Sequence, residues 1–269
     1  MLENMRLSEI YAAIETFAPL SFQEEYDHSG LQVGSFDADA RPCDPELTGA
    51  LVCLDVTEEV LREAAGEGCN LVISHHPLLF HPLAELSGES WQQRCVVNAL
   101  RKGIAIYSAH TSLDNAEGGV SWEMARRIGL ERVEFLVPRP DGGGSGAIGV
   151  LTDSVKDEAF AALLRRVFGV KCISHTPFDG RTIRKVALCG GSGAFLSGAA
   201  RAAGADCFVT GEMGYHQFFD TEGLQAYSLG HFQSEQFTVN LLSERLDAMF
   251  PKARILRSSI CTNPTEYFI

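Results

Sequence analysis

The sequence of 269 residues lacks any Cys-x-x-Cys pair, and its apolar runs stay well short of the roughly 20 residues that cross a bilayer. These absences argue against a zinc ribbon, a disulfide framework and a membrane span. The eight cysteines occur singly, several of them within apolar runs, as is usual for buried thiols. Because a charged and then apolar leader is also absent, we expect a cytoplasmic protein with no membrane partner.

Positive charge is scarce as well. Asp and Glu outnumber Lys and Arg by 35 to 22, which gives a formal net charge of −13. Since no basic stripe accumulates, the charge argues against nucleic acid as a partner and favours bound cations. The sequence also lacks a Gly-x-Ser-x-Gly elbow, and none of its cysteines belongs to a Cys-x-x-Cys redox motif. A serine or cysteine nucleophile therefore has little support.

Two segments of the chain share one order of strand, turn, helix, Gly turn and strand. They cover residues 50–76 and 186–212, and Cys53 aligns with Cys189 without a gap. Each segment is followed by Tyr-Ser and then by His, three residues and a carboxylate. The pattern predicts an internal duplication.

The alternation of strands and helices predicts an α/β fold with two related domains. The first domain is expected at residues 1–128, completed by about 230–269, and the second at 129–229. The first domain opens with an amphipathic helix over residues 7–17, which has apolar residues at helical spacing. Between the two halves, the Gly-rich stretch 138–146 predicts a flexible or turn-rich segment.

Side chains that can bind a divalent metal follow four of the predicted strand ends, where functional groups gather in α/β sheets. They are His75 and His76, His110 and Asp114, Glu212 and His216, and His231 and Glu235. Adjacent residues of an extended chain point to opposite sides. We therefore expect His75 and His76 to reach two different ions, which a carboxylate can bridge at about 3.5–4 Å as in many hydrolases.

Other polar residues have simpler explanations. His28, His81 and His175 lie in polar loops and are expected at the surface, whereas His216 fits a hydrogen-bonded helix residue as well as a pocket residue.

The turn at residues 189–195 opens a helix and could bind phosphate. It lacks the Lys of a P-loop, so Ser192 is expected to cap the helix instead. Asp27, in the loop 27–35, could reach a pocket, but a structural turn is the default interpretation.

Taken in order, these segments resemble the GTP cyclohydrolase 1 type 2 homologues, which are also described as Nif-three-like dinuclear metal centre hexameric proteins. The resemblance lies in residues 27–34, 74–77, 108–114, 190–193, 210–216 and 230–235.

The resemblance implies a two-domain α/β protomer within a toroidal homohexamer, with a pair of metal ions facing an inner cavity. His76 and Asp114 would hold one ion, His75 and His231 the other, and Glu235 would bridge both. Each subunit would thus carry two divalent ions, and Zn, Fe, Mn and Co all suit the mixed imidazole and carboxylate ligands.

The resemblance also places His110 and His216 beside the metals, and with Glu212 they are our candidate catalytic residues. The family usually has Trp-Asp-Asn where this chain has Tyr-Asp-His at 26–28, and more often Asp in place of Glu212. These departures leave the metal ligands intact but alter the pocket wall.

Two functions compete at this point. The first is a metal-dependent hydrolase of a small, nucleotide-like substrate, in which His110 or His216 shuttles protons. The alternative is a non-catalytic metal-binding or regulatory hexamer that acts through protein partners. A closed ligand shell would favour the alternative, because catalytic sites keep an open position.

Overall fold

The computed structural model describes residues 5–268, and the chain divides into two compact units. Unit 1 combines residues 5–113 with Phe237–Thr262, and unit 2 combines Asp114–Gln236 with residues 263–268. Both units mix helices with a sheet, as predicted for an α/β fold.

Unit 1 is built on a five-stranded sheet with the order β1-β6-β5-β4-β13. Its strands are β1 (Gly30–Val33), β4 (Ala50–Cys53), β5 (Leu71–Ser74), β6 (Ala105–Ser108) and β13 (Ile255–Arg257). Only β1 runs antiparallel to its neighbour. The central strands β4, β5 and β6 are buried at every position, as expected for a parallel sheet covered by helices on both faces.

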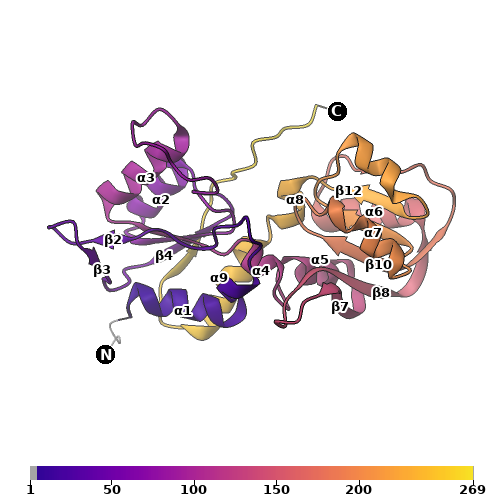
Figure 1. Cartoon of the computed structure of the whole chain (residues 1–269), viewed down its shortest axis with the longest axis horizontal. Coiled ribbons are helices and arrows are strands. Elements are labelled where there is room, and N and C mark those ends of the chain that lie inside the picture. Colours follow the sequence, from indigo (N-terminus) through magenta and orange to yellow (C-terminus); the bar gives the residue numbers. More distant parts are fainter. Residues whose placement is uncertain (1–4, 269) are drawn as a thin grey trace. The chain divides into compact units, whose positions relative to one another are not determined.

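Helices cover both faces of this sheet (Figure 1). The pair α2 (Glu58–Gly66) and α3 (Trp91–Lys102) lies on one face, and α1 (Leu7–Phe17) lies with α9 (Thr238–Met249) on the other. Helix α1 has the bounds that the sequence predicts. The shorter elements are η1 (Leu20–Phe22), β2 (Ser35–Phe36), β3 (Pro42–Cys43) and α4 (Thr111–Asp114).

Unit 2 is built on a six-stranded sheet with the order β7-β8-β10-β11-β12-β9. Its strands are β7 (Leu130–Pro138), β8 (Gly144–Lys156), β9 (Ser174–His175), β10 (Thr182–Cys189), β11 (Cys207–Thr210) and β12 (Gln225–Ser228). Strands β10, β11 and β12 are parallel, and the other pairings are antiparallel.

The helical segments of unit 2 are α5 (Val120–Ile128), α6 (Asp157–Phe168), η2 (Ala194–Leu196), α7 (Ser197–Ala202), η3 (Tyr215–Thr221) and α8 (His231–Glu235). Helix α5 packs on β7, β8 and β10. The chain therefore enters unit 2 at Asp114, earlier than the predicted boundary at residue 128, because the apolar face of α5 is buried on the second sheet. The return to unit 1 comes at Phe237, after α8.

The Gly-rich stretch 138–146 is the turn of the β7–β8 hairpin, with Pro138 paired to Gly144. The predicted turn is correct, but the segment lies inside unit 2 and does not join two domains. A β-carbon at Gly144 would overlap the ring of Phe135, so this position needs a glycine for the close packing of the hairpin.

The two sheets share a core order. In each, three parallel strands (β4-β5-β6 and β10-β11-β12) lie side by side, with an antiparallel strand beyond the third. The last residues of the parallel strands are in register, and they are Cys53, Ser74 and Ser108 in unit 1 and Cys189, Thr210 and Ser228 in unit 2. This common order is the one that the repeated sequence pattern predicts, while the duplication itself stays a prediction.

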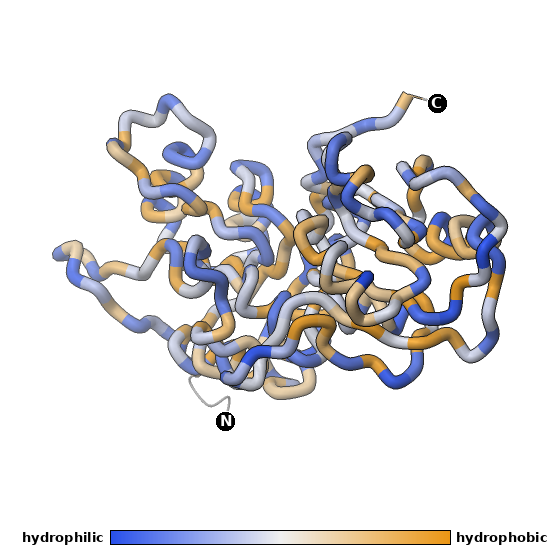
Figure 2. Tube along the Cα trace, turned by 45° about the vertical axis from the view of Figure 1, so that its right-hand side comes forward, coloured by the Kyte–Doolittle hydropathy of each residue, from blue (hydrophilic) through white to orange (hydrophobic). Residues whose placement is uncertain are grey.

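Short apolar stretches alternate with polar ones along residues 5–268 (Figure 2). Within residues 5–268, no helix is both long and apolar enough to cross a membrane. The eight cysteines form no disulfide, as predicted.

Phe208, fully buried in β11, should be a main contributor to the stability of unit 2. We expect Phe208→Ala to lower the free energy of unfolding by about 3–5 kcal/mol, because it leaves a cavity in the core. Phe219→Ala removes a ring that is 69% exposed, so this substitution should change the free energy of unfolding by less than about 0.5 kcal/mol. Urea denaturation of both variants tests this, and equal losses would contradict the packing described here.

Candidate metal centre

His75 and His76 follow the end of β5, where the backbone turns. Their N–H groups donate to the carbonyls of Cys53 and Leu54 at 3.2 and 2.9 Å, and the Ser74 hydroxyl donates to the His76 carbonyl at 2.8 Å. The two ring centroids lie 4.9 Å apart. The expectation that the rings point to opposite sides is therefore wrong, because strand alternation ends at Ser74.

Each of these two imidazoles is held at its Nδ1 atom. His75 Nδ1 lies 3.0 Å from the Ala109 carbonyl, and His76 Nδ1 lies 2.7 Å from Asp55 Oδ1. The Thr262 hydroxyl donates to the other oxygen of Asp55 at 2.5 Å. Burial would raise the pKa of Asp55, but the hydrogen bonds from His76 and Thr262 outweigh it and the pKa lies below its usual value. An acceptor at Nδ1 fixes the tautomer in which Nε2 carries the lone pair.

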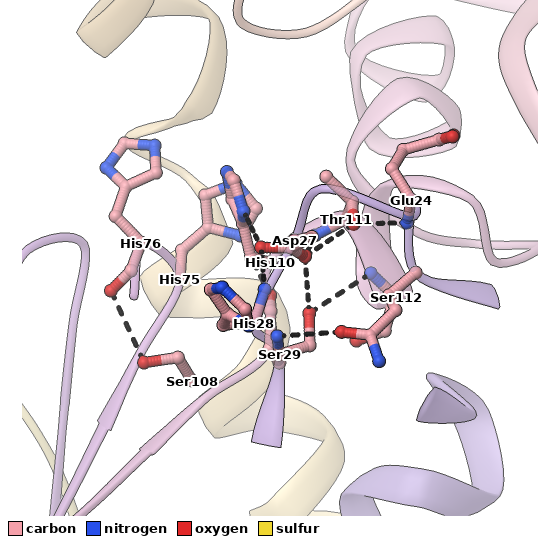
Figure 3. Close-up of polar contacts among 12 residues, drawn as sticks. Glu24, Asp27, His28, Ser29, His75, His76, Ser108, His110, Thr111 and Ser112 are labelled. Atoms are coloured by element: carbon pink, nitrogen blue, oxygen red, sulfur yellow. Dashed lines mark hydrogen bonds and ion pairs between the residues drawn. The ribbon is translucent and has the colours of Figure 1, made fainter. Parts of the chain in front are cut away.

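His110 completes a cluster of three imidazoles in unit 1. Its ring centroid lies 5.4 Å from that of His75 and 5.6 Å from that of His76. His110 Nδ1 lies 2.7 Å from Asp27 Oδ1 (Figure 3). The same rule of an acceptor at Nδ1 thus holds for all three rings.

Asp27 is more than the structural turn that its loop suggests. Its buried carboxylate accepts hydrogen bonds from His110, from the Thr111 amide and hydroxyl at 3.0 and 2.5 Å, and from the Ser29 hydroxyl at 2.7 Å (Figure 3). Burial alone would raise the pKa of Asp27. The hydrogen bonds outweigh it, so the pKa lies below its usual value and the group is charged.

In unit 2, His231 begins helix α8 and Glu235 ends it. His231 Nε2 lies 3.0 Å from Glu235 Oε2, and His231 Nδ1 lies 3.3 Å from Glu212 Oε2. Glu212 in turn accepts a hydrogen bond of 2.5 Å from the Ser192 hydroxyl. Burial raises the pKa of Glu212, but Ser192 and His231 bring it below its usual value. Ser192 is not the predicted helix cap, because Gly193 occupies the N-cap position.

The glycine-rich turn after β10 makes room for helix α8. A β-carbon at Gly191 would overlap Glu235 Oε1 and lie 3.4 Å from His231 Cε1, and the residue has a φ of +56°. The Gly191 N–H donates to the Ser234 hydroxyl at 3.0 Å, and a β-carbon at Gly211 would overlap that same oxygen. The glycines at these strand ends therefore seat the turn of helix that carries His231 and Glu235.

The other candidate residues lie on α4 and η3. Asp114 is the last residue of α4. His216 lies exposed on η3, with its ring 5.2 Å from Tyr215 and 6.5 Å from Phe219. The histidines expected at the surface are indeed exposed, and they are His28, His81 and His175.

The donor set fits a divalent transition metal, for which imidazole nitrogens and carboxylate oxygens are the usual ligands. His75, His76 and Glu235 could each offer one ligand atom to a metal ion. Asp55 is a functional residue that the sequence analysis does not predict. It lies two residues after the end of β4, just as His76 lies two residues after the end of β5, and this position could have indicated it.

Comparison with known proteins identifies the family of this chain. The family model Duf34/NIF3 (NGG1p interacting factor 3) matches residues 5–264, so the chain belongs to this family. The resemblance stated from the motifs is thereby confirmed. A relative from Lactococcus lactis subsp. lactis (strain IL1403), named "GTP cyclohydrolase 1 type 2 homolog", is 33% identical and covers 97% of this chain and 98% of its own length.

Solved structures show the same fold. A Bacillus cereus protein related to NIF3 has a TM-score of 0.86 at 24% identity, with 99% of this chain and 100% of that chain covered. A hypothetical protein of Staphylococcus aureus has a TM-score of 0.88 at 23% identity, over the same shares of the two chains.

Asp55→Asn should weaken metal binding, because the neutral amide no longer supports the imidazole of His76 with a negative charge. We expect a loss of about 10- to 100-fold in affinity, as is typical when the partner of a ligand is changed. Competition against a chelator measures it, with the exposed Asp247→Asn on α9 as the matched control. Parent-like affinity in Asp55→Asn would refute the supporting role.

Gly191→Ala should displace the Glu235 carboxylate, because the new methyl group overlaps it and the left-handed backbone disfavours a side chain. We expect reduced metal content and a loss of roughly 1 kcal/mol or more in unfolding free energy. Gly198→Ala on α7, where a β-carbon meets nothing within 4 Å, should keep the metal content of the parent and should not lower the unfolding free energy. Metal analysis and denaturation of the two variants test this prediction. Parent-like metal content and stability in Gly191→Ala would contradict the role of Gly191 in making room for Glu235.

Proposed function

We propose that this protein is a metal-dependent hydrolase of a small, nucleotide-like substrate, acting with two divalent ions per subunit. His75, His76, Asp114, His231 and Glu235 would hold the ions. His75 and His76 belong to unit 1, and Asp114, His231 and Glu235 belong to unit 2.

The observation that carries the proposal is the Nδ1 contact of each ligand imidazole. His75 and His76 each place Nδ1 at an oxygen of the protein, so Nε2 is the nitrogen that each can offer to a metal. His231 has Nδ1 at Glu212 and Nε2 at Glu235, the carboxylate that the proposal makes a ligand beside it. Metal-binding histidines nearly always have such a partner on the second nitrogen. Histidines that only stabilise the fold need not all leave the same ring nitrogen available to a ligand.

Two divalent ions at these ligands would supply positive charge that polarises a scissile bond and stabilises developing negative charge. The protein itself provides the group that moves a proton. Charged Asp27 keeps the proton on His110 Nδ1, so Nε2 of His110 is the atom that accepts a proton from a substrate or water molecule and returns it. The Thr111 and Ser29 contacts hold Asp27, and through it the His110 ring, in place.

The name of the Lactococcus lactis relative supports a nucleotide-like substrate. The expected homohexamer and the cytoplasmic location belong to the same proposal, and light scattering of the purified protein tests the assembly.

Glu235→Gln should abolish metal-dependent turnover, because the proposed bridging ligand loses its charge. We expect a fall of at least about 100-fold, beyond the range for outer partners of a metal. The measurement is hydrolysis by the metal-loaded chain across a panel of cyclic, phosphorylated and purine substrates. Glu244→Gln on α9, whose side chain is 68% exposed, is the control.

Two outcomes would contradict the proposal. Turnover that survives in Glu235→Gln would show that the centre is not used. A parent protein that binds two ions but hydrolyses none of the panel would favour the non-catalytic alternative.

A further inference from the structure

Two aromatic side chains lie beside the imidazole cluster of unit 1. The Phe80 ring is half-buried, and its centroid lies 6.0 Å from that of His110 at an interplanar angle of 86°. The Tyr26 ring lies 6.3 Å from Phe80, and Tyr26 is 61% exposed. We call Tyr26 and Phe80 the aromatic shelf. Neither is part of the buried core, so their packing alone does not explain them.

The shelf is preformed by hydrogen bonds. The Leu79 amide donates to Gln32 Oε1 at 3.1 Å, and Gln32 Nε2 donates to the His28 carbonyl at 2.5 Å. One side chain of β1 thus ties the segment that carries Phe80 to the segment that carries Tyr26. A shelf held in this way costs little ordering entropy when a ligand binds.

The ring contacts of Phe80 are edge to face, and none of the three is a stacked contact. Phe80 meets Tyr26, His81 and His110 at angles of 66°, 66° and 86°, so these neighbours lie edge to face and not parallel to it. A flat ring placed parallel to Phe80 would add a stacked contact to these three edge-to-face contacts within residues 5–268. Its polar edge would lie near His110, whose Nε2 can exchange a hydrogen bond with a ring nitrogen or carbonyl.

We propose that Tyr26 and Phe80 form a stacking subsite for a purine- or pyrimidine-like ring of the substrate. The inference rests on the proposed function, since it describes the substrate of the same centre. An aliphatic group would gain nothing from the imidazoles, and a protein partner needs about 1,200 Å² or more of buried surface, far beyond two side chains. One heteroaromatic ring suits both the size and the polarity of this place.

The experiment uses the metal-loaded full chain and calorimetric titration with guanosine, adenosine, cytidine and uridine, with free ribose as the non-aromatic probe. We expect at least one nucleoside to bind and ribose not to bind. Tyr26→Ala and Phe80→Leu should weaken nucleoside binding by about 5- to 100-fold, as for the loss of one stacking contact. Tyr26→Phe keeps the ring and should bind like the parent.

Phe36→Ala is the matched control, because Phe36 is an aromatic residue of unit 1 that is 49% exposed and lies on β2. It should bind nucleosides like the parent. The proposal is overturned if no nucleoside binds, if ribose binds equally well, or if the two shelf variants match Phe36→Ala.

The same samples separate this inference from the hydrolase itself. Shelf variants that hydrolyse a non-aromatic substrate at the parent rate, with parent metal content, would remove the subsite and leave the hydrolase. Nucleoside binding that depends on the shelf, in a chain without metal-dependent turnover, would keep the subsite and remove the hydrolase.

Discussion

The structure of the candidate centre depends on one interaction, the hydrogen bond at Nδ1 of each imidazole. A backbone carbonyl holds His75, and carboxylates hold His76, His110 and His231. At His75, His76 and His110 this contact sets both the tautomer and the ring orientation, so that Nε2 is the atom presented, whereas His231 also has Nε2 3.0 Å from Glu235 Oε2. Without these partners the same histidines could rotate and bind through either nitrogen, and the ligand geometry would be lost.

The sheets make these contacts possible because their parallel strands end in register. Asp55, His75 and His110 each follow the end of a neighbouring strand of unit 1, and so a carboxylate after β4 reaches an imidazole after β5. In unit 2 the corresponding places hold glycines, Glu212 and the start of α8. One sheet edge therefore presents imidazoles directly, while the other presents a single imidazole, that of His231, on a helix turn seated by glycines.

Much of this could be predicted from the sequence. Periodicity predicts α1 and the strand–helix–strand units, since local patterns decide such elements. The histidines stand out because two adjacent imidazoles directly follow an apolar strand. The domain boundary at Asp114 could not be predicted, because it depends on which sheet buries α5. The partners of the imidazoles were also missed: Asp27 and Asp55 are far from His110 and His76 in sequence, and only pairing of the strands brings them together.

The central claim is that the protein fixes, before any metal binds, the ring nitrogen that His75 and His76 offer. A crystal structure of the metal-loaded protein tests it most directly. The account predicts coordination through Nε2 of His75, His76 and His231, with their Nδ1 atoms still at Ala109, Asp55 and Glu212. Coordination through Nδ1, or ions bound elsewhere with these imidazoles left out, would contradict it.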